Sequence, residues 1–136
     1  YERGERNVSQ DVIRGKIEDI INDGDACYVA LDGMEIIGFI IAVREKHIRT
    51  NHVACIVAGI LEKYCGKGIG TELFRNVFGW AEEKGVKKLE LTVITENTRA
   101  FNLYKKLGFK AEGLREMSML KNGKYFDEYY MAKLIN

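Results

Sequence analysis

The sequence YCGKGIG, residues 64–70, holds the densest group of glycines in this chain and directly precedes a segment with helical periodicity. Backbone N–H groups from Gly66 to Thr71 can form a concavity at the start of such a helix, where the helix dipole favours an anion. Glycines at positions 66, 68 and 70 also let the main chain approach a pyrophosphate without intervening side chains. A tight turn that needs only the flexibility of glycine is the alternative interpretation.

The spacing of these glycines excludes two common phosphate-binding loops. A P-loop requires GxxxxGK followed by Ser or Thr, whereas Lys67 is followed by Gly68. A dinucleotide-binding fingerprint requires GxGxxG, and the glycines here alternate with single residues instead. Only the general chemistry of anion binding by backbone N–H groups is left.

Upstream of the glycine cluster the sequence predicts a helix and three strands. Ser9 is a candidate N-cap for a helix that ends near Asn22 to Gly24. The apolar positions that follow helical spacing in it are Val12, Ile13, Ile17, Ile20 and Ile21. Residues 26–45 predict two strands joined by a hairpin turn at Asp32-Gly33. Residues 52–60 are apolar nearly throughout and predict a central strand.

Downstream, the sequence predicts two helices, a strand and a hairpin. A helix from about Gly68 to Lys84 would end at Gly85 and bury one stripe of residues, Ile69, Leu73, Val77 and Trp80. A strand over 87–94 is followed by a short helix within 97–108, capped by Asn97 or Thr98. Residues 109–120 and 124–135 predict a long hairpin around Asn122-Gly123. This order, without repeats or linkers, predicts one α/β or α+β domain over residues 1–136 with a mixed sheet.

Composition narrows the function classes. The 136 residues carry a net charge of +1 without a basic block, so no nucleic-acid partner is expected. No apolar run approaches the roughly 20 residues of a membrane span, so we expect a soluble protein without a membrane partner. The odd set Cys27, Cys55 and Cys65 favours a reducing cytoplasm. The isolated His47 and His52 lack partners at ligand spacing, so no metal is expected.

Three segments, taken in order, resemble the GNAT superfamily of acetyl-CoA-dependent N-acyltransferases. They are the Q/R-x-x-G-x-G/A loop at Cys65–Gly70, the N-x-x-A-x-x-L-Y-x-x-x-G-F segment at Asn97–Phe109, and the closing hairpin entered by GKYFDE. The resemblance extends from about Asp25 to the C-terminus and implies a mixed, mostly antiparallel central sheet flanked by helices. Only residues 1–8 precede the predicted first helix, so the first strand and helix of the family are expected to be missing.

The resemblance also implies acetyl-CoA as co-substrate, held where a central strand separates from its neighbour. Main-chain groups of Ile60 and Leu61 would meet the pantetheine arm and the thioester carbonyl. The pyrophosphate would lie on the glycine loop, which comprises Cys65, Gly66, Lys67, Gly68, Ile69, Gly70 and Thr71. Asn97 would bind the cofactor or cap its helix, or do both, and Asn102 would face the pantetheine arm. Lys105 and Lys106 are expected to be solvated, although one of them is a candidate for the nucleotide phosphates.

By the same resemblance, Tyr104 would protonate the departing thiolate. A phenol suits this task because its pKa of roughly 10 keeps it protonated at neutral pH. The general base stays open: the candidates by residue type are His52, Glu62, Glu90, Glu96 and Glu128, and a chain of water molecules is equally credible. Asp127 and Glu128 are candidates for holding a cationic substrate.

The predicted function is acetyl transfer from acetyl-CoA to a primary amine by direct attack in a ternary complex. A non-catalytic acyl-CoA-binding or regulatory domain of the same fold is the alternative. The acceptor, a small-molecule amine or a peptide amine, is not specified by the sequence. Cys65 stands where the family usually carries arginine or glutamine, for which we expect weaker cofactor binding at most. The closing hairpin is a candidate surface for a homodimer by family analogy.

Overall fold

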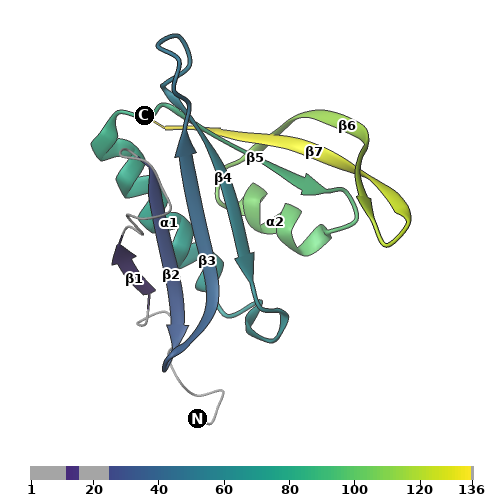
Figure 1. Ribbon diagram of the computed structural model, residues 1–136, viewed down its shortest axis with the longest axis horizontal. Coiled ribbons are helices and arrows are strands. Elements are labelled where there is room, and N and C mark those ends of the chain that lie inside the picture. The colour runs from purple at the N-terminus through teal and green to yellow at the C-terminus, as the bar shows by residue number, and fades with distance from the viewer. Residues whose placement is uncertain (1–11, 16–24, 136) are drawn as a thin grey trace.

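The computed structural model describes residues 12–15 and 25–135 (Figure 1). Its elements, in chain order, are β1 (Val12–Gly15), β2 (Ala26–Asp32), β3 (Glu35–Arg44), β4 (Val53–Ile60), the 3-10 turn η3 (Glu62–Tyr64), α1 (Ile69–Lys84), β5 (Lys88–Ile94), α2 (Thr98–Lys106), β6 (Lys110–Lys121) and β7 (Lys124–Leu134). The strands form one sheet in the order β1-β2-β3-β4-β5-β7-β6. Only β4 and β5 pair in parallel, which confirms the predicted mixed, mostly antiparallel sheet of an α/β domain.

The N-terminal helix prediction is wrong where the structure can test it. Val12–Gly15 is a strand that pairs antiparallel with β2, so β1 forms an edge of the sheet. The β-branched residues Val12 and Ile13 suit a strand, and the edge of β2 offers them backbone hydrogen bonds that no sequence pattern reveals. The other positions of that prediction, Ser9, Ile17, Ile20, Ile21 and the end at 22–24, lie outside the described residues.

The first hairpin and the central strand follow the sequence with small differences. Asp32 pairs with Glu35, so the two loop residues are Gly33 and Met34, one position later than predicted. Gly33 takes a φ of +64°, a conformation that glycine adopts easily. Strand β4 lies between β3 and β5, as a central strand should. Its burial alternates, however, and Val57 is 58% exposed on the face opposite the helices.

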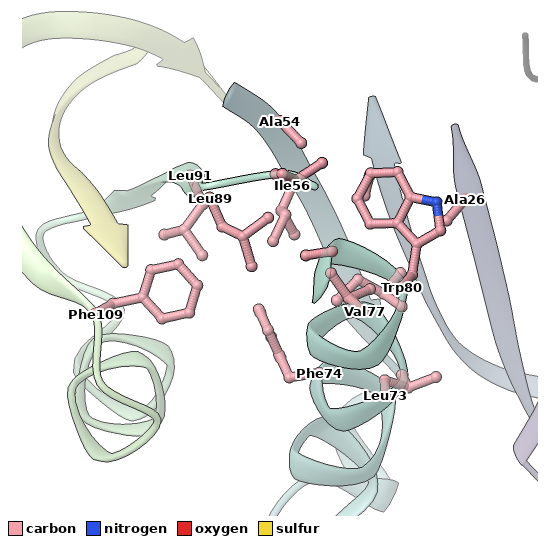
Figure 2. Packing of buried hydrophobic residues seen from close by; sticks show 14 of the residues in the cluster. Ala26, Ala54, Ile56, Leu73, Phe74, Val77, Trp80, Leu89, Leu91 and Phe109 are labelled. Atoms are coloured by element: carbon pink, nitrogen blue, oxygen red, sulfur yellow. The ribbon is translucent and has the colours of Figure 1, made fainter. Parts of the chain in front are cut away.

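Both helices pack against one face of the sheet and enclose the core with it. The predicted stripe of α1 is buried, and the helix ends at Gly85, whose φ is +76°. Phe74 of α1 contacts Tyr104 and Phe109 with ring centroids 5.6 Å apart in both cases. Figure 2 shows Phe74, Val77 and Phe109 converging on Leu89, Leu91 and Ile56 of the sheet. This aromatic contact sets the position of α2 relative to α1. Neither helix described here is long and apolar enough to cross a membrane.

The Phe74–Phe109 contact predicts a large effect of truncation. Phe109 is buried, and replacing it by alanine removes a ring that touches both helices. We expect Phe109→Ala to lower the free energy of unfolding by about 3–5 kcal/mol in urea titrations. Tyr125→Ala, at a position that is 56% exposed on the neighbouring hairpin, is the control and should change it by less than about 1 kcal/mol. Equal losses in the two variants would contradict the role given to Phe109.

Candidate active site

A gap between two central strands organises the site. β4 and β5 pair only from Val53–Lys88 to Cys55–Glu90, and beyond these three pairs the two strands diverge (Figure 1). The register with β3 decides which β4 groups face the gap. The Leu61 N–H donates to Ile37 O at 2.9 Å, so alternate residues back from Leu61 bond to β3. The N–H and C=O groups of Ala58 and Ile60 therefore point towards β5.

The glycine turn connects this strand to α1. Gly66 and Gly68 have φ values of +79° and +85°, and no heavy atom lies within 4 Å of a Cβ built on either. No side chain caps the N-terminus of α1, so the N–H groups of its first turn remain available to an anion. Both features fit the predicted phosphate cradle. They also explain why glycine is needed at positions 66 and 68.

Gly70 is a glycine for a different reason. A Cβ there would lie 2.9 Å from Leu103 Cδ2 and 3.2 Å from Ile60 Cδ1. The residue is buried, so it lets α1 approach α2 and the end of β4 closely. Ligand approach was predicted for all three glycines; Gly70 lines the pocket, and its close contacts add a packing role at this position.

A pocket of about 440 Å³ lies between the glycine turn, the end of β4 and α2. It is lined by Ala58, Gly59, Ile60, Tyr64, Cys65, Gly66, Gly68, Ile69, Gly70, Thr71, Leu73, Phe74, Asn97, Arg99, Ala100, Leu103, Tyr104 and Lys106. The predicted residues that meet here are Ile60, Cys65, Gly66, Gly68, Ile69, Gly70, Thr71, Asn97 and Tyr104. Segments far apart in the sequence thus form one wall, as the motifs predicted.

Three predicted cofactor residues lie outside the lining. Lys67 and Asn102 are exposed, and Asn102 does not line the pocket although it neighbours Arg99 and Lys106 on α2. The prediction that the main chain of Leu61 meets the cofactor is wrong for its N–H group, because that N–H is already bonded to Ile37 O. The direction of that N–H depends on the pairing of β4 with β3, which the motif does not reveal.

Tyr104 lies in the pocket wall against two aromatic rings. Its centroid is 5.6 Å from that of Phe74 and 6.1 Å from that of Phe109. Burial raises the pKa of the Tyr104 phenol above its ordinary value. The phenol therefore keeps its proton through neutral and mildly alkaline pH, which a proton donor requires.

Asn97 combines the two roles considered for it. Its side-chain oxygen accepts the Ala100 N–H at 3.2 Å, which makes it the N-cap of α2. The same residue lines the pocket. The capping prediction is therefore confirmed, and contact with a cofactor stays a prediction.

The sequence reasoning missed the contribution of Arg99 and Tyr64. Arg99 and Lys106 are seven residues apart on α2, so they share one helix face, and both line the pocket. Among the described lining residues there is no aspartate or glutamate, so the wall is electropositive. The Tyr64 hydroxyl donates to Asp32 Oδ2 at 2.6 Å and ties the start of the glycine turn to the β2–β3 hairpin. The seven-residue spacing of Arg99 and Lys106 was the sequence signal that could have identified Arg99 as a pocket residue.

None of the candidate bases belongs to the described lining of this pocket. Glu90 lies 3.3 Å from the Lys88 ammonium, and Glu96 lies 3.6 Å from that of Lys124. His52 and Glu62 are exposed. Glu128 is buried and accepts a hydrogen bond from Ser118 Oγ at 2.9 Å. The pocket therefore favours cofactor binding and proton donation rather than proton abstraction.

Comparison with known proteins agrees with this geometry. The acetyltransferase (GNAT) family model matches residues 3–109. This chain belongs to that family. The chain is 31% identical over 105 residues to the L-amino acid N-acetyltransferase AaaT of Escherichia coli (strain K12), and the match covers 76% of this chain and 64% of that protein. The chain thus spans less than two thirds of this relative.

Solved structures show the same fold. A GNAT-family acetyltransferase from Streptococcus pneumoniae superposes with a TM-score of 0.78 and 32% identity, covering 84% of this chain and 69% of that one. A GNAT superfamily phosphinothricin acetyltransferase from Sinorhizobium meliloti, in complex with acetyl-CoA, superposes with a TM-score of 0.75. It is 23% identical, with 83% of this chain and 62% of that chain covered, and it supports the fold alone.

Two cysteines offer an internal test of the pocket. Cys65 lines it, whereas Cys55 is exposed on the opposite face of the sheet, where burial of its thiol and the carboxylates of Glu45 and Glu90 raise its pKa to about 11. We expect saturating acetyl-CoA to slow alkylation of Cys65 by at least about fivefold, because only the ligand-free fraction of the protein would react and this fraction is small at saturation. Peptide mass spectrometry after iodoacetamide treatment measures both sites.

Labelling of Cys55 is the matched control and should not respond to acetyl-CoA. At pH 8 it should also be about ten- to a hundredfold slower than for a thiol of pKa 9.0, because far fewer molecules carry the thiolate and the greater nucleophilicity of that thiolate offsets only part of the loss. Protection of both cysteines to the same degree, or of neither, would contradict the placement of acetyl-CoA in this pocket.

Proposed function

We propose that this GNAT-family chain transfers the acetyl group of acetyl-CoA to a primary amine by direct attack in a ternary complex. The observation that carries the proposal is one pocket that joins the uncapped N-terminus of α1, the main-chain groups of Ile60 and the buried phenol of Tyr104. The names of the relatives support it: the Escherichia coli protein is named an L-amino acid N-acetyltransferase.

The residues present fit acetyl-CoA. The N–H groups of the glycine turn and of the first turn of α1 would bind the pyrophosphate. The cations Arg99 and Lys106, on the facing side of the pocket, would complement the remaining phosphate charge. Ala58 and Ile60 would offer main-chain groups to the amides of the pantetheine arm, as a paired strand would.

In the proposed transfer, one bond forms and one bond breaks. The neutral amine nitrogen attacks the thioester carbonyl carbon, and the C–S bond breaks as the new C–N bond forms. The Ile60 N–H would stabilise charge on the carbonyl oxygen, and such a donor contributes roughly two to three powers of ten in rate. The departing thiolate takes the proton of Tyr104, water removes the proton that the amine loses, and Tyr104 then regains a proton from solvent. Alignment of two bound reactants supplies much of the acceleration.

We also propose that the protein works in the reducing cytoplasm. Cys27, Cys55 and Cys65 are all free thiols, and none forms a disulfide within the described residues.

The proposal is tested by acetyl-CoA-dependent release of free thiol. We expect acetyl-CoA to bind, as measured by calorimetry, and CoA thiol to appear when a panel of amines is added, with the acetylated amine detected by mass spectrometry. Binding without thiol release from any amine would favour a non-catalytic acyl-CoA-binding domain. Absence of binding at millimolar acetyl-CoA would contradict both functions.

Tyr104→Phe tests the proton donor. We expect kcat to fall by about 10²–10⁴-fold while the Kd for acetyl-CoA stays within about twofold, because the variant removes only the hydroxyl. In the parent protein the raised pKa keeps the acid form present as pH increases, so the loss of activity due to this group should begin only above about pH 10. That decline should be missing from the pH profile of the variant.

Tyr129→Phe is the matched control. Tyr129 is another half-buried tyrosine that touches α2, with its ring centroid 5.0 Å from that of Phe101. It is not part of the described pocket lining, so its kcat should be unchanged. A Tyr104→Phe variant with normal kcat would remove Tyr104 from the reaction.

A further inference from the structure

Glu128 is a buried carboxylate that forms no ion pair with another described residue. The residue is 6% exposed, and its Oε1 accepts a hydrogen bond from the Ser118 hydroxyl at 2.9 Å. None of the ion pairs found between described residues includes it. Arg115, which is opposite Glu128 in the β6–β7 register, instead lies over the ring of Tyr130, 5.3 Å from the centroid. Burial of an unpaired carboxylate is costly, so a cation from outside the described chain would stabilise it.

The second oxygen of this carboxylate is open to a ligand. Among the described residues, Trp80 Nε1 is the one side-chain N or O atom that is fully buried and has no hydrogen-bond partner. Glu128 Oε2 has no hydrogen-bond donor there either, yet it is not among the fully buried atoms. Oε2 therefore retains some solvent-accessible surface although the residue is only 6% exposed, while Ser118 holds the other oxygen and orients the carboxylate.

The position of Glu128 in the sheet indicates on which face its carboxylate lies and how far it is from the β4–β5 gap. Neighbouring Tyr129 contacts Phe101 of α2, so alternation along β7 places the Glu128 side chain on the opposite face of the sheet. Glu128 pairs with Ile94 at the end of β5, three residues before the pocket residue Asn97. Adjacent strands are about 4.8 Å apart, so the carboxylate lies roughly one strand spacing from the edge of the β4–β5 gap.

We propose that Glu128 binds a second cationic group of the acceptor and so selects amines that carry two positive charges. This inference rests on the proposed acetyl transfer. The nitrogen that attacks must be neutral, so it cannot be the lasting partner of a carboxylate. The cofactor pocket lies on the helix side of the gap, so in this proposal the acceptor would approach from the opposite face, on which Glu128 lies. There Glu128 holds its remote ammonium while the near amine reaches the thioester. A short α,ω-diamine, or a compound with the same two charges, is the substrate class.

The test compares two acceptors that differ in one charge. Diaminobutane and aminobutanol have the same length, but only the diamine carries a second ammonium. For the parent protein we expect kcat/KM from thiol release to favour diaminobutane by about ten- to a hundredfold, the effect of one charge-assisted contact. Glu128→Gln keeps the shape and the Ser118 partner, and it should reduce the preference to about twofold or less while kcat/KM for aminobutanol and KM for acetyl-CoA stay unchanged.

Glu112→Gln is the matched control. Glu112 is an exposed carboxylate of β6 that is paired with Lys88 at 3.2 Å. Its neutralisation changes the net charge equally, so a preference that survives in Glu112→Gln and is lost in Glu128→Gln assigns the effect to position 128. Equal losses in the two variants would overturn the proposal, because they would indicate a general field rather than a contact.

A shortened side chain gives a readout that a structural role would not produce. Glu128→Asp keeps the charge but withdraws it by one methylene, so the α,ω-diamine with the highest kcat/KM should be about one methylene longer for this variant than for the parent protein. This variant also covers the case in which Glu128→Gln fails to fold, which thermal melts would show. A length preference that does not move would contradict direct contact with the remote ammonium.

Equilibrium binding separates this inference from the proposed function. Diaminobutane is titrated into the CoA-saturated parent protein and into Glu128→Gln. Thiol release without any diamine preference in the parent would overturn the role of Glu128 and leave acetyl transfer intact. Tight, Glu128-dependent diamine binding without thiol release from any amine would overturn acetyl transfer and leave the cation site intact.

Discussion

The structure depends on the early end of the parallel pairing between β4 and β5. A ladder that continued to Ile60 would satisfy the main-chain groups of the strand and close the sheet. Instead the ladder stops after three residue pairs, and the N–H and C=O groups of Ala58 and Ile60 face an opening. An extended molecule with its own amides can complete that ladder. The feature that would weaken an ordinary sheet is therefore the feature that makes it a binding site.

The two helices keep this opening at a fixed width. Gly70 brings α1 against Leu103 of α2 and Ile60 of β4, and any side chain at this position would have to displace one of them. The rings of Phe74, Tyr104 and Phe109 fill the space beneath. Tyr104 thus belongs to the core and to the pocket at once. Its packing fixes the phenol and, by excluding water, also maintains its proton.

Patterns among neighbouring residues predicted most of the helices, strands and turns. The features that these patterns missed depend on strand pairing between segments far apart in the sequence. Glycines with positive φ, the Asn97 cap and the stripe of α1 each act within a few residues, so the sequence reveals them. The helix predicted across Val12–Gly15 fails because pairing with β2 competes with helical periodicity. The Leu61 N–H was assigned to the ligand although the β3 register commits it to Ile37. Residue type made Glu128 a candidate base and a candidate for holding a cationic substrate, but it did not reveal the burial of its carboxyl group, which arises where β7 pairs with β5 and with β6.

The two faces of the gap carry different charged groups, and in the proposed reaction this difference would separate the routes of the two reactants. On the helix side, the described pocket residues include Arg99 and Lys106 and no carboxylate, which suits a polyanion such as CoA. On the other side lies the buried carboxylate of Glu128, which suits a cation. Two oppositely charged reactants would then enter from opposite faces and meet between β4 and β5. Acetylation removes the charge of the amine that reacts but leaves the remote ammonium charged. The contact with Glu128 would therefore persist in the product, so this carboxylate would act on selection of the acceptor and not on release of the product.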